Sequence, residues 1–444
     1  MRLRLLGTGS AAGWPNPWCS CASCAAALRQ GVVRGHTSAL LDDRLLLDVG
    51  AEVPRAALRA GVSLAGVEAV LVGHHHPDHH DVAAWRWRGW ASSRRPLHLV
   101  GPPAVVDDAR THLDPSVRAT AVRAGDALQV AGHAVRVLPA DHGRPELGPA
   151  VLYDVTSPDG SRLLWGVDTG PLPEAALSAL RERAYDVVLL ELTGSGSPHH
   201  LDLTTWPAQV AALRRAGAVT PSTRLLAVHL GHDNPPPDEL DGLLSAWGAS
   251  APRDGDVVEV GPTAPPAAPR ARRTLVLGGA RSGKSAHAEA LVAAEPAVTY
   301  VATAPARPGD DEWTARVGVH VARRPTSWTT LETGDVAEAL RQADGTVLVD
   351  DLGLWLTRLL DDACAWEDRS GAQAVVDAAL PGLLEAYASA RSAVLVAPEV
   401  GGGLVAPTLG GRLFVDLLGT TTAALARASD EVWQVVAGLP RRLR

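Results

Sequence analysis

Seven histidines and aspartates in the first half of the chain have the residue types and spacing of a metal site. Four follow the apolar segment 69–72 in the pattern H-x-H-x-D-H, and the others lie in or just after later apolar segments. The seven are His74, His76, Asp78, His79, His142, Asp168 and His229. Alternate histidines place two imidazoles on one side of an extended loop, and the Asp-His pair can serve a second ion. We therefore predict a dinuclear site for Zn²⁺, Mn²⁺ or Fe, bridged by Asp168.

Two metal ions so close together would bind and deprotonate a water molecule and would neutralise a phosphoryl group under attack. The predicted chemistry is therefore hydrolysis, with Asp78 as a candidate catalytic residue as well as a ligand. A lone histidine such as His98 or His133 is better explained as a surface or core residue.

Three cysteines near the start of the chain form a second metal-binding pattern. Cys19, Cys21 and Cys24 give C-x-C-x-x-C. Disulfides between cysteines this close in sequence would be strained, whereas three thiolates suit one tetrahedral Zn²⁺. A fourth ligand is needed, and His232, three residues after His229, is the candidate for this structural zinc. The alternative is three free thiols.

The second half contains a phosphate-binding pattern, G-x-x-x-x-G-K-[ST]. It comprises Gly278, Gly279, Ala280, Arg281, Ser282, Gly283, Lys284 and Ser285. Lys284 is the only lysine in the chain, and its compact ammonium can fold over phosphates where a guanidinium would fit poorly. Ser285 would offer its hydroxyl to Mg²⁺, and Asp350, which ends an apolar strand, would be the acid on the Mg²⁺ side. The pattern predicts a nucleoside triphosphate site, the alternative being a Gly-rich turn that binds nothing.

The elements that must position these residues fall into two α/β halves. Residues 1–261 mix short apolar segments with helical stretches, as in an αββα sandwich, and each candidate ligand lies at the carboxyl end of a strand. In residues 273–444 strands and helices alternate, as in a parallel sheet covered on both faces. Between them, residues 262–272 are rich in Pro and Ala and are predicted to be a semi-rigid linker.

Composition limits the classes of partner. The chain has 444 residues and a net charge of −8 without a basic run, which argues against a polynucleotide partner. It contains no apolar stretch of membrane-spanning length and no recognisable export signal. We expect a cytoplasmic protein without membrane contact, whose cysteines are not paired as disulfides.

The first half resembles the metallo-β-lactamase superfamily of metal-dependent hydrolases, from Gly7-Thr8-Gly9 through H-x-H-x-D-H and Asp168 to His229. The resemblance implies the sandwich fold and the two metals, but it does not name the small phosphoester expected as substrate. The cysteine pattern resembles the phosphodiesterases of phosphonate breakdown, which carry a Cys₃His zinc clip beside the active site. That likeness implies that His200 faces the substrate phosphate and acts in catalysis; a surface pair with His199 is the alternative.

The second half resembles the bifunctional adenosylcobinamide kinase/adenosylcobinamide-phosphate guanylyltransferase family. Besides the phosphate loop, the matching pieces are 300–303, 310–312, 315–320, 323–325, Trp328, Asp350, 354–357, 399–401 and 430–432. The family implies ATP or GTP with Mg²⁺, adenosylcobinamide and its phosphate as substrates, and His320 as the histidine that takes GMP from GTP. Taken alone, His320 could be a helix-surface histidine.

Three hypotheses follow. The favoured one is a homo-oligomeric enzyme of cobalamin assembly fused to a dinuclear phosphoester hydrolase. The second keeps a metal-dependent phosphodiesterase beside a non-catalytic nucleotide-binding module. This hypothesis rests on three places where the sequence differs from the usual family pattern, Pro398, 351–353 and 420–423, because such differences could remove catalysis. The third, a tRNA-processing nuclease, is disfavoured by the acidic charge.

Overall fold

Residues up to 261 form two seven-stranded sheets in the computed structural model, which describes residues 1–142, 148–194, 196–261, 272–304, 324–402 and 405–444. The first sheet has the order β14 (Val257–Glu259), β1 (Arg2–Gly7), β2 (Ser38–Leu41), β3 (Leu45–Leu47), β4 (Ala69–Leu71), β5 (Leu97–Gly101), β6 (Val117–Ala121). The second has the order β13 (Ala249–Ser250), β12 (Arg224–Val228), β11 (Val187–Glu191), β10 (Arg162–Gly166), β9 (Val151–Thr156), β8 (His133–Pro139), β7 (Ala127–Val130).

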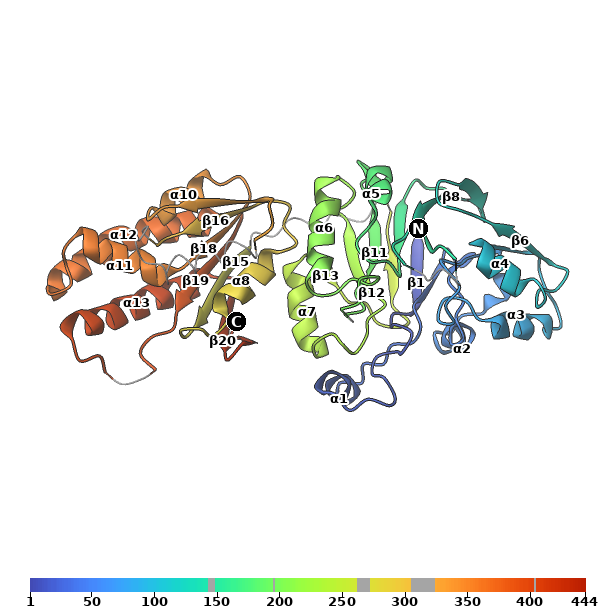
Figure 1. Ribbon diagram of the computed structural model, residues 1–444, viewed down its shortest axis with the longest axis horizontal. Coiled ribbons are helices and arrows are strands. Elements are labelled where there is room, and N and C mark those ends of the chain that lie inside the picture. Colours follow the sequence, from blue (N-terminus) through green and yellow to red (C-terminus); the bar gives the residue numbers. More distant parts are fainter. Residues whose placement is uncertain (143–147, 195, 262–271, 305–323, 403–404) are drawn as a thin grey trace. The chain divides into compact units, whose positions relative to one another are not determined.

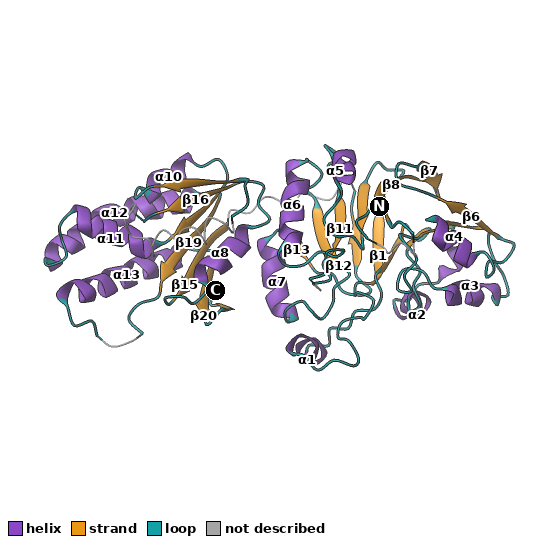
Figure 2. Ribbon diagram, viewed as in Figure 1, coloured by secondary structure: helices purple, strands orange, loops and turns teal. Residues whose placement is uncertain are grey.

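The two sheets pack face to face and helices cover their outer sides (Figures 1 and 2). Side chains such as Leu5, Leu71 and Leu189 fill the space between the sheets. On one outer side lie α2 (Val53–Arg59), α3 (Val82–Gly89) and α4 (Pro103–Ala109), and on the other lie α5 (Glu174–Leu180), α6 (Thr205–Arg215) and α7 (Pro237–Ala246). A short helix, α1 (Ala22–Arg29), follows the cysteine loop. This is the expected αββα sandwich.

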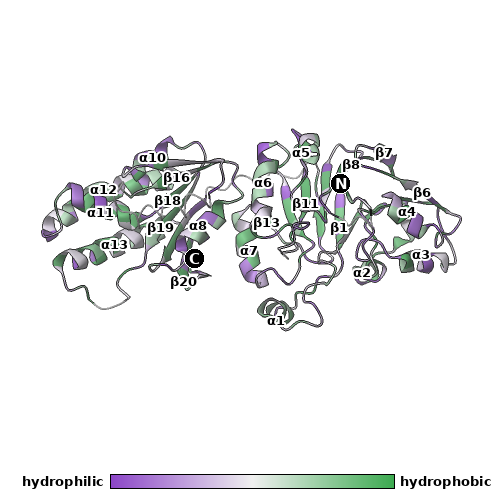
Figure 3. Ribbon diagram, viewed as in Figure 1, coloured by the Kyte–Doolittle hydropathy of each residue, from purple (hydrophilic) through white to green (hydrophobic). Residues whose placement is uncertain are grey.

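Most strands are apolar along their length because both faces are covered. Figure 3 shows β11 as a hydrophobic strand, and all five of its residues are buried. The strands β3 to β6 are parallel, as are β10 to β13, and β8 runs in the direction of β10 because β9 is antiparallel to both. The carboxyl ends of β8, β10, β11 and β12 therefore lie at one edge of the second sheet.

The second half forms one seven-stranded sheet with the order β17 (Trp328–Glu332), β16 (Val298–Ala302), β18 (Thr346–Asp350), β19 (Ser392–Pro398), β15 (Arg272–Gly278), β20 (Glu431–Val436), β21 (Leu439–Arg442). All strands are parallel except β21. The described helices are α8 (Lys284–Val292), α10 (Val336–Gln342), α11 (Leu352–Asp362), α12 (Arg369–Ser389) and α13 (Leu409–Ala428). The parallel α/β sheet of the prediction is confirmed.

The chain divides into two compact units, Met1–Ala268 and Pro269–Arg444. That division falls inside the predicted linker, of which residues 262–271 lie outside the described residues. The exact domain bounds stay a prediction. None of the helices that the structure describes has the length and apolarity needed to cross a bilayer.

Candidate functional site

One group of four potential ligands gathers where β4, β8 and β10 end. It consists of His74, His76, His142 and Asp168. His74 Nε2 lies 2.8 Å from His76 Nδ1, and His142 Nε2 lies 3.1 Å from the same His76 nitrogen. Asp168 Oδ2 lies 3.2 Å from His74 Nε2. Four donor atoms from three strand ends thus converge on one point.

A second group shares Asp168 with the first. It consists of Asp78, His79, Asp168 and His229, all buried. His229 Nε2 lies 2.9 Å from Asp168 Oδ1 and 3.2 Å from Asp78 Oδ2, and His79 Nε2 lies 3.0 Å from Asp78 Oδ2. Asp168 therefore takes the central position that the sequence pattern gave it: its Oδ2 lies 3.2 Å from both His74 Nε2 and His79 Nε2, and its Oδ1 faces His229. The role of these seven residues as ligands stays a prediction.

The donor chemistry of both groups fits divalent cations. Burial lowers the pKa of His74, and it lowers that of His142 to about 4, so both imidazoles keep a free lone pair at neutral pH. Burial alone would raise the pKa of Asp168, but His229 and His79 outweigh it and hold that pKa well below its ordinary value. Asp168 Oδ1 is buried, and His229 Nε2 lies 2.9 Å from it without the geometry of a hydrogen bond. A cation held between the two atoms would satisfy both of them.

Three further residues orient the imidazoles, and the sequence prediction did not include them. Asp48 Oδ2 lies 3.0 Å from His79 Nδ1, and Thr193 Oγ1 lies 2.8 Å from His229 Nδ1. Glu191 is fully buried and accepts hydrogen bonds from the hydroxyl of Thr193 and from backbone N–H groups. Partners of this kind fix the tautomer of a metal-binding histidine. Asp48 and Glu191 could have been found by the rule that found Asp168, because each lies at the carboxyl end of an apolar strand.

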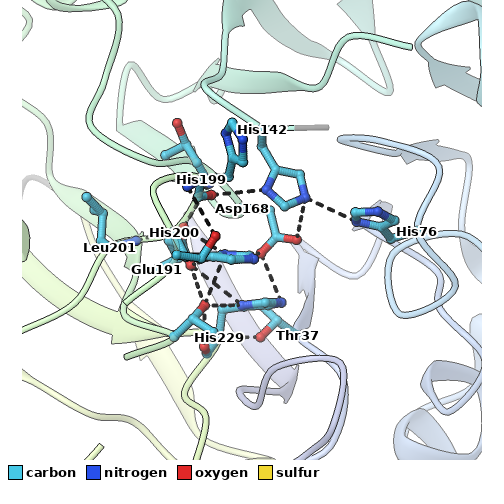
Figure 4. A network of polar contacts seen from close by, with 12 residues as sticks. Thr37, His76, His142, Asp168, Glu191, His199, His200, Leu201 and His229 are labelled. Carbon is cyan, nitrogen blue, oxygen red and sulfur yellow. Dashed lines mark hydrogen bonds and ion pairs between the residues drawn. The ribbon is translucent and has the colours of Figure 1, made fainter. Parts of the chain in front are cut away.

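His200 lies beside the candidate metal ligands His142, Asp168 and His229 (Figure 4). Its Nδ1 is 3.0 Å from Glu191 Oε2, and its side chain is 20% exposed. Burial opposes protonation of His200, but the hydrogen bond to Glu191 and the carboxylate charges outweigh it and raise the pKa. A histidine with a raised pKa at the edge of such a site can donate a proton to a leaving group.

The cysteine pattern also folds into one place. Cys19, Cys21, Cys24 and His232 present ligand atoms within 4.8 Å of one another. Cys21 Sγ lies 3.8 Å from His232 Nδ1. The backbone N–H of Cys24 and the His232 ring lower the pKa of Cys21 to about 6, which favours the thiolate that binds zinc. The four residues can hold one tetrahedral zinc ion, and this assignment stays a prediction.

His75 and His80 belong to the same histidine run but lie apart from both metal groups, near Asp108. The indole N–H of Trp85 donates to His80 Nε2 over 3.0 Å. A neutral His80 must then carry its proton on Nδ1, the nitrogen that faces Asp108 at 3.6 Å. His80 then has no free lone pair for a metal, so this trio is a poor candidate for a metal site.

In the second unit, the phosphate loop connects β15 to α8, as predicted. Gly283 has a φ of 93°, which favours glycine. A Cβ on Gly278 would lie 2.7 Å from the carbonyl oxygen of Val435, so only glycine fits there. Lys284 begins α8 and is 9% exposed, with its Nζ 4.0 Å from Asp351 Oδ2. The loop therefore has both the backbone shape and the cation of a phosphate site.

Asp350 faces the loop from the end of β18. Its Oδ1 accepts a hydrogen bond from Ser285 Oγ over 3.1 Å, and its Oδ2 accepts one from Tyr300 Oη over 2.6 Å. The guanidinium of Arg324 lies 3.4 Å from the centre of the Tyr300 ring. Ser285 and Asp350 are thus placed as a Mg²⁺-binding pair would be. The predicted nucleotide-accepting residue, His320, lies outside the described residues.

Two family models match the chain. Residues 274–443 match the model described as "Cobinamide kinase / cobinamide phosphate guanyltransferase". Residues 43–230 match the "Beta-lactamase superfamily domain". The two matches fall on the two halves defined above.

Curated relatives divide in the same way. The bifunctional adenosylcobalamin biosynthesis protein CobP of Pseudomonas aeruginosa is 41% identical over 179 residues, which is 39% of this chain and 97% of that protein. CobU of Salmonella typhimurium is 36% identical over 180 residues, 38% of this chain and 98% of that protein. A Ribonuclease Z of Mycobacterium sp. (strain KMS) is 30% identical over 203 residues, 40% of this chain and 65% of that protein.

Among solved structures, a crystal structure described as a new diphosphatase from the PhnP family aligns with a TM-score of 0.48 and 22% sequence identity. The alignment covers 59% of this chain and 98% of that one.

Proposed function

Because the chain belongs, through residues 274–443, to the family of bifunctional cobinamide kinases and cobinamide phosphate guanyltransferases, we propose that this unit carries out both reactions. It would phosphorylate the aminopropanol hydroxyl of adenosylcobinamide with a nucleoside triphosphate. It would then transfer GMP from GTP to the phosphorylated product. The main structural support is the hydrogen bond from Ser285 to Asp350 beside the phosphate loop, because these two residues are placed as a pair that binds the Mg²⁺ of a nucleotide would be.

The residues of the loop would divide the work of binding a triphosphate. The backbone N–H groups of 279–284 would donate to phosphate oxygens, and the Lys284 ammonium would neutralise charge near the β- and γ-phosphates. Ser285 and Asp350 would hold Mg²⁺, which supplies further neutralisation of the phosphates. Tyr300 donates to Asp350 and so fixes the carboxylate. Ser285, Asp350 and Tyr300 already contact one another, which supports a site arranged in advance for the triphosphate and its Mg²⁺.

For the second reaction we assign His320 as the acceptor of GMP. A ring nitrogen of His320 would form a bond to the α-phosphorus of GTP while the bond from that phosphorus to the bridging oxygen breaks, and pyrophosphate would leave. The phosphate of the cobinamide phosphate would next attack the same phosphorus, form the new phosphoanhydride and release the histidine.

Covalent labelling tests this assignment. Full-length protein incubated with [α-³²P]GTP and Mg²⁺ should retain label after denaturation, and His320→Ala should retain none. ATP-dependent phosphorylation of adenosylcobinamide is the internal control, because the first reaction does not require His320. Label that persists in His320→Ala would refute the assignment. Nucleotide binding by wild type without turnover on cobinamide would favour the non-catalytic module.

For the first unit we propose hydrolysis of a small phosphoester at a site holding two divalent cations. Seven residues that follow the ends of four strands, β4, β8, β10 and β12, support this, with Asp168 shared between the two groups. A pair of divalent cations supplies Lewis acidity and lowers the pKa of a bound water. Zn²⁺ and Mn²⁺ both suit the mixed imidazole and carboxylate ligands. Cys19, Cys21, Cys24 and His232 would hold a further, structural zinc.

The remaining residues of this site would handle protons and geometry. His200, oriented by Glu191, would protonate the leaving oxygen of the ester. Asp48 and Thr193 would hold His79 and His229 in the tautomers that present Nε2 to a cation. Asp78 faces the same space and would orient the attacking water.

Substrate class can be tested directly. Full-length protein loaded with Zn²⁺ or Mn²⁺ should hydrolyse a small phosphodiester such as bis(p-nitrophenyl) phosphate and should leave precursor tRNA intact. Asp168→Asn should abolish this hydrolysis and lower the bound metal, while the exposed Asp107→Asn serves as the matched control. Cleavage of precursor tRNA instead would favour the third hypothesis, a nuclease, to which the similarity to a Ribonuclease Z also points.

We propose that the two activities occupy the units 1–261 and 273–444, joined by the linker 262–272. A cytoplasmic location and a homo-oligomeric state stay predictions. The fusion itself suggests that the hydrolase acts on a phosphorylated intermediate of the same biosynthesis.

A further inference from the structure

The first unit contains a cavity that none of the proposed chemistry uses. It has a volume of about 520 Å³ and lies between α2, α3 and the outer face of β3, β4 and β5. Buried apolar side chains line its interior, among them Leu46, Val70 and Trp85. Cavities of this size and lining are typical of small-molecule sites.

The mouth of the cavity is open to solvent and carries aromatic side chains. Trp87 and Leu58 at the mouth are 37% and 60% exposed, and Trp90 is 78% exposed. Exposed apolar side chains of this size gathered at a cavity mouth are unusual on a protein surface without a binding role.

Positive charge surrounds this mouth. Arg55, Arg88, Arg94 and Arg95 line it, and the described lining includes no aspartate or glutamate. Arg88 and Arg94 share one carboxylate, that of Asp114. The guanidinium of Arg55 lies over the Trp87 ring at 5.2 Å without a carboxylate partner in the described part of the chain.

Arg95 is the second such guanidinium. It is exposed and makes no ion pair among the described residues, although it lies within Coulombic reach of Glu68. That carboxylate is already held by Arg44 at 2.7 Å. Arg55 and Arg95 therefore remain available to an anion at the mouth.

We propose that this cavity binds a small amphipathic carboxylate, with its hydrocarbon body between α2 and α3 and its carboxylate at Arg55 and Arg95. Moving a hydrocarbon chain from water into the apolar interior lowers the free energy, and the guanidinium groups offer charge-assisted hydrogen bonds to a carboxylate. A nucleic-acid strand fits less well, because it needs an extended basic groove with flat stacking surfaces, whereas this site is a single deep apolar hollow.

Isothermal titration of full-length protein with sodium dodecanoate, below its micelle concentration, tests the proposal. We expect one saturable site per chain. The double variant Arg55→Gln/Arg95→Gln should bind at least about tenfold more weakly. Arg59→Gln is the matched control, since Arg59 lies one turn further along α2 and does not line the cavity. Decanol, which has no charge, should also bind wild type at least about tenfold more weakly than decanoate.

A substitution that fills the cavity provides a second, independent test. Ala84 lines the cavity from α3, and Ala84→Leu places extra carbon atoms there with a residue that favours helix. This variant should lose dodecanoate binding while it keeps phosphodiesterase activity, which shows that it is folded. Dodecanoate binding that is unsaturable, or that survives both Ala84→Leu and the double arginine change, would overturn the proposal. Displacement of dodecanoate by an oligothymidylate that binds more tightly would also overturn it.

Discussion

Glutamine in place of Glu191 would keep the size of the side chain but would change the proton on His200 and remove the acceptor of the Thr193 hydroxyl. Glu191 Oε1 accepts the backbone N–H groups of Thr169 and Leu201 at 3.0 and 3.2 Å, while Oε2 faces His200 Nδ1 at 3.0 Å. In Glu191→Gln the carbonyl oxygen must stay with the two N–H donors, so the amide NH₂ turns towards His200. The imidazole must then accept at Nδ1 and carry its proton on Nε2.

The expected loss follows from this exchange. The carboxylate contact with His200 is a charge-assisted hydrogen bond worth about 1.5–3 kcal/mol, which corresponds to about a 10- to 160-fold decrease in kcat. The pKa of His200 also predicts the direction in which the pH dependence of kcat should shift in Glu191→Gln. Burial lowers the pKa of His200, but Glu191 outweighs burial and raises it. A proton donor is lost as pH rises through its pKa, so removing the Glu191 charge should move the alkaline limb of kcat to lower pH.

The assay compares two esters that differ in leaving group. Phenolate needs a proton on departure and p-nitrophenolate needs one much less, so Glu191→Gln should slow the phenyl ester far more than the p-nitrophenyl ester. Metal content measured by mass spectrometry should be unchanged, and the exposed Glu174→Gln is the matched control. Equal slowing of both esters, or no slowing with metal retained, would refute the role of Glu191 in orienting a proton donor.

Three other predictions concern the metal clip and the nucleotide site. Lys284→Arg should weaken ATP binding at least about tenfold, measured by titration, because a broad guanidinium replaces the buried ammonium in the loop. Tyr300→Phe removes the donor to Asp350 and should raise the Mg²⁺ concentration needed for half-maximal kinase activity. Cys21→Ser should remove one zinc per chain. Because zinc displaces a proton from each thiol that it binds, the affinity of wild type for this zinc should fall as the pH is lowered; an affinity that does not change with pH would contradict the assignment.

The sequence predicted the fold of both units because most of their strands are apolar and are followed by polar residues. His142, Asp168 and His229 come from three different strands, and the end-of-strand rule was enough to group them. Glu191 fits the same rule but was missed, since a glutamate that ends an apolar strand resembles a surface residue until its burial is known. The phosphate-loop pattern of 278–285 predicted the nucleotide site, and the likeness of 273–444 to a known family, whose model matches 274–443, added the expected substrates.

The cavity between α2 and α3 could not have been predicted. Its lining comes from segments that lie up to about fifty residues apart, and each apolar residue in them would satisfy an ordinary core pattern equally well. A hollow arises only from how well these side chains fill the space that the helices leave, which periodicity does not encode.

Lys284 has a practical consequence because no other lysine occurs in the sequence. Reagents that acylate ε-amino groups have a single lysine target, and that target lies within the phosphate loop, where it is nearly shielded from solvent. A bound triphosphate would cover it further. Mass spectrometry of one tryptic peptide after brief acylation would therefore report the fraction of nucleotide-loaded chains, without a radioactive ligand or an engineered tag.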